Sequence, residues 1–354
     1  MTRANAYAAP AAGKPLAPFA FDRRDPGPRE VALDILFCGI CHSDIHQARD
    51  EWGGSTFPMV PGHEIVGRVA SSPSGKFRKG ELVGIGCMVD SCHSCGPCRR
   101  GFEQFCEKGA AWTYNSTEMD KRTPTYGGYS THIVASEDFI LRIPEGLDPA
   151  GAAPLLCAGI TTYSPLKQWP AKRVAVVGLG GLGHMAVKLA ASMGAEVTML
   201  STSPSKEKDA RRLGASGFAN TRDAATFEKL KGKFDLIVDT ISAPHDYNAH
   251  LRLLDVQGTM VVVGVPPEAT QVHAFSLISG NKRLAGSLIG GNRRLAGSLI
   301  GGIAQTQEML DHCGKHRIVS DVEVIPASRV NEAYERMMKG DVRYRFVIDA
   351  ASLR

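Results

Sequence analysis

The hydrophobic and polar positions of the chain follow three successive patterns. In the first part, short segments of alternating character, such as 31–36 and 131–135, predict strands with one buried face. Beyond about residue 158, continuous apolar strands alternate with helical segments. After residue 300 the mixed pattern returns and ends in a predicted helix at 330–339 and a strand at 344–348. The first and last parts are therefore expected to belong together.

The middle part predicts a doubly wound α/β domain. Its strands are expected at 172–178, 196–200, 234–239 and 259–264, and its helices at 182–193, 206–213 and 245–254. Such alternation is typical of βαβ units around a parallel sheet, the Rossmann architecture. We expect this domain to span 158–300, inserted into a mainly β domain formed by 1–157 and 301–354.

Composition narrows the class of protein. A chain of 354 residues with 43% hydrophobic and 22% charged residues is long enough for two ordinary folded domains. Its net charge of +5 comes without a basic run, so no nucleic-acid partner is expected. No apolar run approaches the ~20 residues that span a bilayer, and residues 1–18 lack the apolar core of a signal peptide. Nine cysteines, clustered and odd in number, indicate metal binding in a reducing, cytoplasmic compartment.

A cysteine-rich segment gives the strongest single signal. Its four cysteines, separated by two, two and seven residues, are Cys92, Cys95, Cys98 and Cys106. Four thiolates at this spacing suit a tetrahedral Zn²⁺ with no open position, which is a structural site. The alternative is four free cysteines, in a segment with little apolar material to hold it. Cys38, Cys87 and Cys313 have no recognisable partner and are expected to be small core residues.

A second set of metal-ligating residues is spread along the chain. His63 and Glu64 follow Gly62 at the start of a predicted strand, Cys41 lies upstream and Cys157 lies far downstream. Two thiolates and an imidazole form a three-ligand zinc set that leaves one position open, and Glu64 can orient a ligand or approach the metal itself. Taken alone, the His63 motif is a weak signal, because most buried histidines are hydrogen-bonded core residues.

A glycine-rich turn follows the first strand of the middle domain. The segment Gly178-Leu179-Gly180-Gly181-Leu182-Gly183 matches G-x-G-x-x-G and stands between a predicted strand and a predicted helix. Glycines at these positions allow a tight turn and close approach of the backbone to a pyrophosphate, which binds at the helix N-terminus. The turn therefore predicts a dinucleotide cofactor.

The end of the next strand predicts which dinucleotide binds. NAD sites place an acidic residue there to bind the ribose 2′-hydroxyl, but this chain has Ser201, followed by Thr202, Ser203 and Lys206. Hydroxyls and a cation in place of a carboxylate favour a 2′-phosphate, and hence NADP(H). The alternative is a solvated turn that caps the next helix, and both roles can coexist.

With these motifs in order, the chain resembles the zinc-dependent medium-chain alcohol dehydrogenases over essentially its whole length. The Ser201–Lys206 turn and the segments 112–115 and 127–130 are similar to the cinnamyl alcohol dehydrogenase branch, which includes NADPH-dependent aldehyde reductases. The resemblance implies a GroES-like catalytic domain, zinc, NADP(H) and a homodimer.

The resemblance also assigns roles to residues outside the motifs. It implies that Ser43 and His46 relay a proton and that Asp44 supports the zinc site. Trp52 and Trp112 match positions that line the substrate cleft, although core packing explains tryptophans equally well. Arg345 matches a position that reaches the cofactor pyrophosphate.

The expected function is the interconversion of aldehydes and primary alcohols with NADP(H), and more narrowly that of a broad-range aldehyde reductase. A zinc-free quinone reductase would lack both cysteine sets, and an NAD(P)-dependent polyol or secondary alcohol dehydrogenase is disfavoured by Ser201. A non-enzymatic zinc module would leave the glycine turn without a role.

An 11-residue segment is repeated in tandem with a single Lys/Arg difference, at 281–291 and 292–302. The family has one copy at this place. Because 11 is odd, one continuous strand would turn every later side chain to the opposite face of the sheet. We expect that one copy pairs in the sheet and that the other loops out or pairs at an edge.

Overall fold

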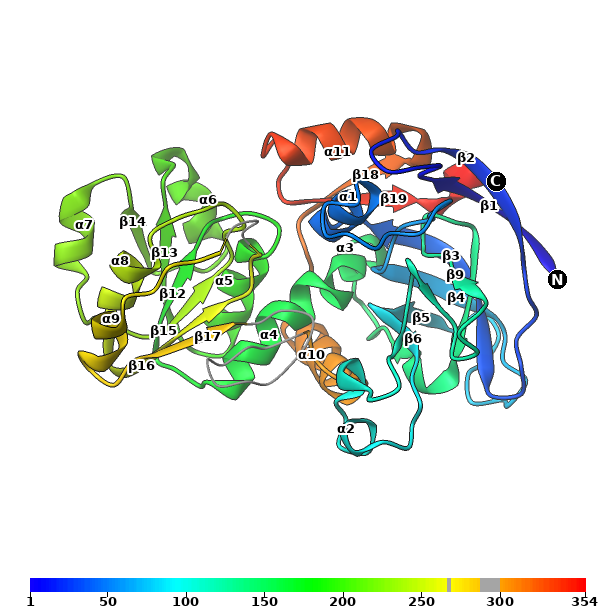
Figure 1. Ribbon diagram of the computed structural model, residues 1–354, viewed down its shortest axis with the longest axis horizontal. Coiled ribbons are helices and arrows are strands. Elements are labelled where there is room, and N and C mark those ends of the chain that lie inside the picture. The colour runs from blue at the N-terminus through cyan, green and yellow to red at the C-terminus, as the bar shows by residue number, and fades with distance from the viewer. Residues whose placement is uncertain (266–268, 287–299) are drawn as a thin grey trace. The chain divides into compact units, whose positions relative to one another are not determined.

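The computed structural model describes residues 1–265, 269–286 and 300–354. The chain divides into two compact units, one of Met1–Cys157 with Gly302–Arg354 and the other of Ala158–Gly301. The second boundary lies one residue from the expected one. In Figure 1 the first unit runs from blue through cyan to green and returns in orange and red, and the second unit runs from green to yellow.

The first unit is built on a largely antiparallel sheet that combines both ends of the chain. The strand order is β11-β5-β4-β3-β19-β18, with β10 also paired to β3. These strands are β3 (Glu30–Gly39), β4 (Ile65–Ser71), β5 (Leu82–Ile85), β10 (His132–Ser136), β11 (Leu141–Arg142), β18 (Val322–Pro326) and β19 (Arg345–Asp349). Because β19 pairs directly with β3, the last part of the chain is an integral strand of this sheet. This confirms that the first and last parts belong together.

Shorter elements surround this sheet. The remaining strands are β1 (Thr2–Ala8), β2 (Ala17–Arg23), β6 (Met88–Asp90), β7 (Ala111–Trp112), β8 (Ser116–Thr117) and β9 (Pro124–Thr125). The helices are α1 (His42–Ala48), α2 (Gly96–Arg99), α3 (Pro149–Ala152), α10 (Ile303–His316) and α11 (Val330–Met338). Helix α11 covers the sheet with apolar residues that join the same core as β3 and β4.

The second unit contains a six-stranded parallel sheet in the order β14-β13-β12-β15-β16-β17. The strands are β12 (Arg173–Val177), β13 (Glu196–Ser201), β14 (Gly217–Asn220), β15 (Phe234–Asp239), β16 (Leu254–Val262) and β17 (Arg283–Gly286). The helices are α4 (Ala158–Gln168), α5 (Gly183–Ser192), α6 (Glu207–Arg212), α7 (Ala224–Lys229), α8 (Tyr247–Arg252) and α9 (Ala274–Ile278). The predicted Rossmann architecture is confirmed.

The order of strands places the glycine turn where a ligand binds in such sheets. From β12 the chain moves to β13 and β14 on one side, and then returns to β15 on the other side. The reversal makes the carboxyl end of β12, which leads into the glycine turn, a topological switch point. The sequence analysis missed β14 and α7, because β14 is only four half-buried residues without an apolar run.

Part of the tandem repeat falls within the described residues. In the first copy, Arg283–Gly286 forms β17 and pairs in parallel with β16. Gly302, the last residue of the second copy, is the N-cap of α10. Residues 287–299, on which the expectation about the other copy rests, lie outside the described residues.

Candidate active site and metal centres

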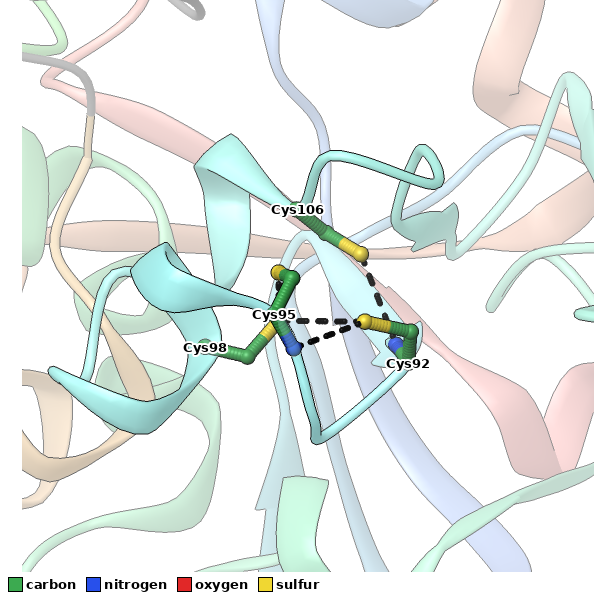
Figure 2. Close-up of side chains that lie close together, drawn as sticks. All are labelled: Cys92, Cys95, Cys98 and Cys106. Carbon is green, nitrogen blue, oxygen red and sulfur yellow. Dashed lines mark hydrogen bonds between the residues drawn. The ribbon is translucent and has the colours of Figure 1, made fainter.

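The four predicted cysteines of the first zinc set lie together in one lobe (Figure 2). Their sulfur atoms all lie within 4.8 Å of one another, and the Cys95 and Cys98 sulfurs are 3.3 Å apart. Backbone N–H groups point at the sulfurs: Cys95 N donates to Cys92 Sγ and Cys92 N donates to Cys106 Sγ, each at 3.4 Å. Such donors stabilise thiolates, and hydrogen bonds from the backbone N–H groups of Ser94 and Cys95 help to lower the pKa of Cys92 to about 5.

The same lobe holds the start of α10. The Glu103 carboxylate accepts a hydrogen bond from Ile303 N at 3.1 Å, so it satisfies one of the free N–H groups of the helix. A Cβ on Gly302 would lie 1.8 Å from the carbonyl oxygen of Gly101, so the close contact requires glycine. His93 is not part of the sulfur cluster, because its side chain is half exposed and contacts Asp90.

The second predicted set is also brought together, from three distant parts of the chain. Candidate ligand atoms of Cys41, His63, Glu64 and Cys157 lie within 4.8 Å of one another, and all four residues are buried. Cys41 is the N-cap of α1 directly after β3, His63 and Glu64 precede β4, and Cys157 ends a 3₁₀ turn. Soft sulfurs, an imidazole and a carboxylate form a donor set that suits zinc.

The Asp44 carboxylate contacts two members of this set, Cys41 and His63. Its fully buried carboxylate accepts hydrogen bonds from Cys41 N at 2.8 Å and Gly62 N at 3.2 Å, and it lies 3.2 Å from His63 Nδ1. Burial opposes the charged imidazolium, but the negative charge of Asp44 raises the pKa of His63 well above its usual value. A carboxylate on one ring nitrogen leaves the other for a metal, which is the arrangement expected of a residue that supports a zinc site.

Two tyrosines complete the surroundings of Asp44 and His63, and the sequence analysis missed both roles. The Tyr129 hydroxyl donates to Asp44 at 3.0 Å, and the Tyr114 ring stacks on His63 with the ring centres 5.6 Å apart. Tyr129 belongs to a segment quoted above only for its family resemblance. The glycine pair before Tyr129 is the feature of the sequence that could have marked it, and the structure gives the reason for glycine there, since a Cβ on Gly128 would lie 2.6 Å from Cys38 Sγ.

Arg345 has a partner that the sequence analysis did not indicate. Its side chain, 3% exposed, forms an ion pair with Glu64, whereas we had expected it to reach a cofactor pyrophosphate. Burial raises the pKa of Glu64 to about 7, while the charge of Arg345 opposes that rise. Glu64 Oε2 has no hydrogen-bond partner within the described parts of the chain, and a Cβ on Gly39 would lie 1.9 Å from it. The expected contact of Arg345 with the cofactor pyrophosphate stays a prediction.

Cys87 also differs from the expectation of a core residue without a partner. It is buried as expected, but its thiol shares a hydrogen bond with Cys157, which is the largest cause of its lowered pKa. A hydrogen bond with Cys157 likewise lowers the pKa of Cys41 well below its usual value. Cys38 and Cys313 are buried in the core as predicted.

The predicted proton-relay residues lie on α1 beside Cys41. The Ser43 hydroxyl is 3.6 Å from Cys41 Sγ, and the His46 imidazole is hydrogen-bonded to Glu51 at the other end of the helix. The Trp52 ring stacks on His46 with the centres 5.0 Å apart and is 46% exposed. Trp112 lies in β7, half-buried and opposite Met88.

The glycine turn in the second unit has the conformation that its sequence predicts. Gly178 has a φ of +88°, and a Cβ on Gly183 would lie 1.9 Å from the carbonyl oxygen of Gly178. None of the described residues has a heavy atom within 4 Å of a Cβ position at Gly180. Leu182 is the N-cap of α5, with Gly181 just before it, so the turn presents the free N–H groups of a ten-residue helix.

The predicted 2′-phosphate turn adjoins the glycine turn. Ser201 ends β13 and accepts a hydrogen bond from Ser203 N at 3.2 Å, and Thr202 is exposed between them. Lys206 Nζ donates to the carbonyl oxygen of Leu179 at 2.8 Å. The lysine therefore brings its positive charge to the glycine turn, where cofactor phosphates bind in such sheets.

Comparison with known proteins identifies the family. Residues 27–145 match the alcohol dehydrogenase GroES-like domain, and residues 181–313 match the zinc-binding dehydrogenase domain. The chain is 52% identical to "NADP-dependent alcohol dehydrogenase C" of Mycobacterium tuberculosis, with 100% of both chains covered. It is 48% identical to "Aldehyde reductase YahK" of Escherichia coli, with 98% of both covered.

Solved structures give the same result. A cinnamyl alcohol dehydrogenase of Sorghum bicolor superposes with a TM-score of 0.92 at 44% identity, covering 99% of this chain and 98% of that one. A cinnamyl alcohol dehydrogenase of Helicobacter pylori in complex with NADP(H) has a TM-score of 0.88 at 39% identity, with 99% of both chains covered. The chain belongs to the zinc-dependent medium-chain alcohol dehydrogenases, in the branch that contains the cinnamyl alcohol dehydrogenases and NADP-dependent aldehyde reductases.

Proposed function

We propose that this enzyme interconverts aldehydes and primary alcohols with NADP(H), and that it acts as a broad-range aldehyde reductase. The observation that carries the proposal is the buried set of Cys41, His63 and Cys157, with Asp44 on the outer nitrogen of His63. It occurs in one chain with a glycine turn and a serine in place of the ribose-binding acid. Relatives of similar length are named for the same chemistry.

We propose two zinc ions per chain. The four cysteines of the lobe would hold one without an open position, and Cys41, His63 and Cys157 would hold the other, with Glu64 as a further ligand or neighbour. When bound, the second zinc polarises the substrate carbonyl and the reduced nicotinamide supplies the hydride. Asp44 fixes the ring of His63, and the Arg345 ion pair restrains Glu64.

The proton in the reaction is handled by residues of α1. Ser43 lies next to Cys41, so its hydroxyl is placed to donate to the oxygen of the reduced product. His46, held by Glu51, exchanges that proton with solvent. Trp52 covers His46 and, with Trp112, lines the substrate cleft in this proposal.

The cofactor is held by the second unit. The N–H groups at Gly180, Gly181, Leu182 and Gly183 bind the pyrophosphate at the start of α5. The hydroxyls of Ser201, Thr202 and Ser203 and the ammonium of Lys206 bind the 2′-phosphate.

We further propose a homodimer and a cytoplasmic location. Among the described strands, β17 is the last one of the parallel sheet, and nearby Phe275 and Ile278 are 69% and 66% exposed, which suits a second copy of the chain. The nine cysteines of the chain, clustered and odd in number, suit a reducing compartment. Across the described residues, none of the helices is long and apolar enough to cross a membrane.

The decisive experiment measures kcat/KM for a panel of aldehydes with NADPH and NADH. We expect NADPH to be preferred, because a charge-assisted phosphate contact contributes about 1.5–3 kcal/mol, or roughly one to two decades in affinity. The double change Ser201→Asp with Lys206→Ala should reverse the preference. A wild-type enzyme that uses NADH at least as well as NADPH would refute this assignment, and absence of aldehyde turnover would refute the reaction.

A further inference from the structure

A buried carboxylate in the second unit is not used by the function proposed above. Asp239 is the last residue of β15, is fully buried, and lies in register with Val177, the residue just before the glycine turn. Its Oδ1 accepts a hydrogen bond from Ile241 N at 3.1 Å, and its Oδ2 lies 3.0 Å from Nε2 of His245. A charge at this position requires a partner, and His245 supplies it.

Both ring nitrogens of His245 face hydrogen-bond acceptors. Nε2 faces the Asp239 carboxylate, and Nδ1 lies 2.9 Å from the carbonyl oxygen of Ala243. A neutral imidazole has one donor and one acceptor, so it can satisfy only one of these contacts. Only the imidazolium donates to both. The geometry therefore assigns a protonated ring.

The surroundings of His245 agree with this assignment. Burial disfavours the charge, but the hydrogen bond and negative charge of Asp239 outweigh burial and raise the pKa of His245. The other titratable groups that face it are Asp246, Tyr247 with its ring centre at 4.7 Å, and His250 at 5.3 Å. Burial lowers the pKa of His250, so that ring is the neutral member of the pair.

The loop between Asp239 and His245 packs against the glycine turn. The Thr240 hydroxyl donates to the carbonyl oxygen of Val177 at 2.8 Å. A Cβ on Gly178 would lie 3.0 Å from the Ile241 side chain, and a Cβ on Gly183 would lie 3.1 Å from the Thr240 hydroxyl. This loop therefore forms part of the support on which the pyrophosphate-binding turn rests.

We propose that His245 is a positioning residue for NADP(H). Its imidazolium bridges Asp239 and the Ala243 carbonyl, holds the loop of residues 240–245 under the glycine turn, and so makes cofactor affinity depend on its protonation. The inference rests on the proposed use of NADP(H). Because the pKa of His245 is raised in the folded protein, this support is complete at low pH and is lost as pH rises through that pKa. Affinity for NADP(H) should therefore fall with rising pH.

The test measures the Kd of NADPH by fluorescence between pH 6.5 and 9.5 for the wild type and three variants. For the wild type we expect Kd to rise by roughly three- to tenfold, since a lost charged hydrogen bond is transmitted in part. His245→Gln should bind more weakly at low pH and should converge with the wild type at high pH. His316→Gln, an exposed histidine in the other unit, is the control that should match the wild type throughout.

Asp239→Asn separates charge from hydrogen bonding. The introduced amide can donate to Nε2 while a neutral His245 still donates from Nδ1 to Ala243, so every contact is satisfied without a proton gain. The Kd of the wild type should depend more strongly on pH than the Kd of His245→Gln. The Kd of Asp239→Asn should lack this additional pH dependence. The midpoint of thermal unfolding is measured for each variant as well. A general loss of stability would lower this midpoint but would not change with pH as the Kd does.

At each pH the Kd of the variant is divided by the Kd of the wild type. This ratio removes the effect of titration of the cofactor phosphate, which is the same for both proteins. A ratio of His245→Gln to wild type that stays constant with pH overturns the inference while leaving the proposed function intact. A wild type that binds no NADPH at any pH overturns both. A ratio that falls toward one as pH rises, with a ratio of Asp239→Asn to His245→Gln that stays constant, supports the inference.

Discussion

The two cysteine sets of this protein are held in contrasting ways. The proposed ligands of the lobe all lie within residues 92–106, and backbone N–H groups of neighbouring residues donate to their sulfurs. The proposed ligands of the second set are Cys41, His63 and Cys157, and they are surrounded by buried charged side chains. In a closed site four thiolates occupy every metal position, so local turns are sufficient to place them. In an open site three ligands must be oriented so that the fourth position stays free, and here distant side chains orient them.

The largest expected effect separates the two sets by activity. His63→Ala should lower kcat/KM at least about a thousandfold, since loss of the Lewis acid removes several kcal/mol of stabilisation from the transition state. The four-cysteine lobe and the NADPH-binding unit should be unaffected. Metal analysis should find one zinc lost per chain, and fluorescence should show unchanged NADPH binding. Retained turnover would mean that His63 is not a ligand.

For the four-cysteine lobe, the expected effect of losing a ligand is a lower stability of the first unit. Cys95→Ser should lose the other zinc and lower the stability of the first unit by about 3 kcal/mol or more, because metal binding and folding are coupled in a segment without its own core. Urea unfolding followed by metal release measures this. We expect the loss of order to extend to the start of α10, where the Ile303 N–H group donates to Glu103. A variant with two zincs and unchanged unfolding would contradict the structural role.

Removal of the Tyr129 hydroxyl tests whether its hydrogen bond to Asp44 helps to orient the ligands of the open site. Tyr129→Phe removes the donor to Asp44 and should weaken zinc binding at the second set by roughly tenfold, about 1.4 kcal/mol, the lower end of what supporting hydrogen bonds contribute. Competition with a chelator gives the affinity, and zinc in the lobe serves as the internal reference. Tyr7→Phe, in the β1 strand, is the matched control. Equal chelator resistance in both variants would show that Asp44 needs no further support.

The smallest effect is expected from a deletion in the tandem repeat, a region that contributes no residue to either cysteine set. Deletion of Asn292–Gly302 joins Gly291 to Ile303 and restores the same Ile-Gly-Gly sequence before α10, so the Gly302 position and its contacts with the lobe are kept. Changing the length of a connection alters closure entropy by only about 0.6 kcal/mol per doubling. We expect equal or better thermal stability and at least equal NADPH turnover. Failure of the shortened chain to fold would show that the second copy has become integral.

Local patterns in the sequence were sufficient for much of this protein. The parallel strands, the glycine turn and the cysteine lobe were predicted because each depends on residues close together in the chain: periodicity, spacing and turn chemistry. The second zinc set was predicted in part by chemistry and in part by family resemblance, since Cys41, His63 and Cys157 are far apart in sequence.

Contacts between distant residues could not be obtained in this way. The pairing of Arg345 with Glu64, the Tyr129 hydroxyl on Asp44 and the thiol of Cys87 beside Cys157 each join segments that carry no mutual signal in a single sequence. The same holds for His245, whose two acceptors appear only once the loop after β15 is folded. The sequence by itself determined which ligands and turns this protein has. The tertiary structure alone decided which charges face one another, because a buried charge is tolerated only where the fold brings its partner.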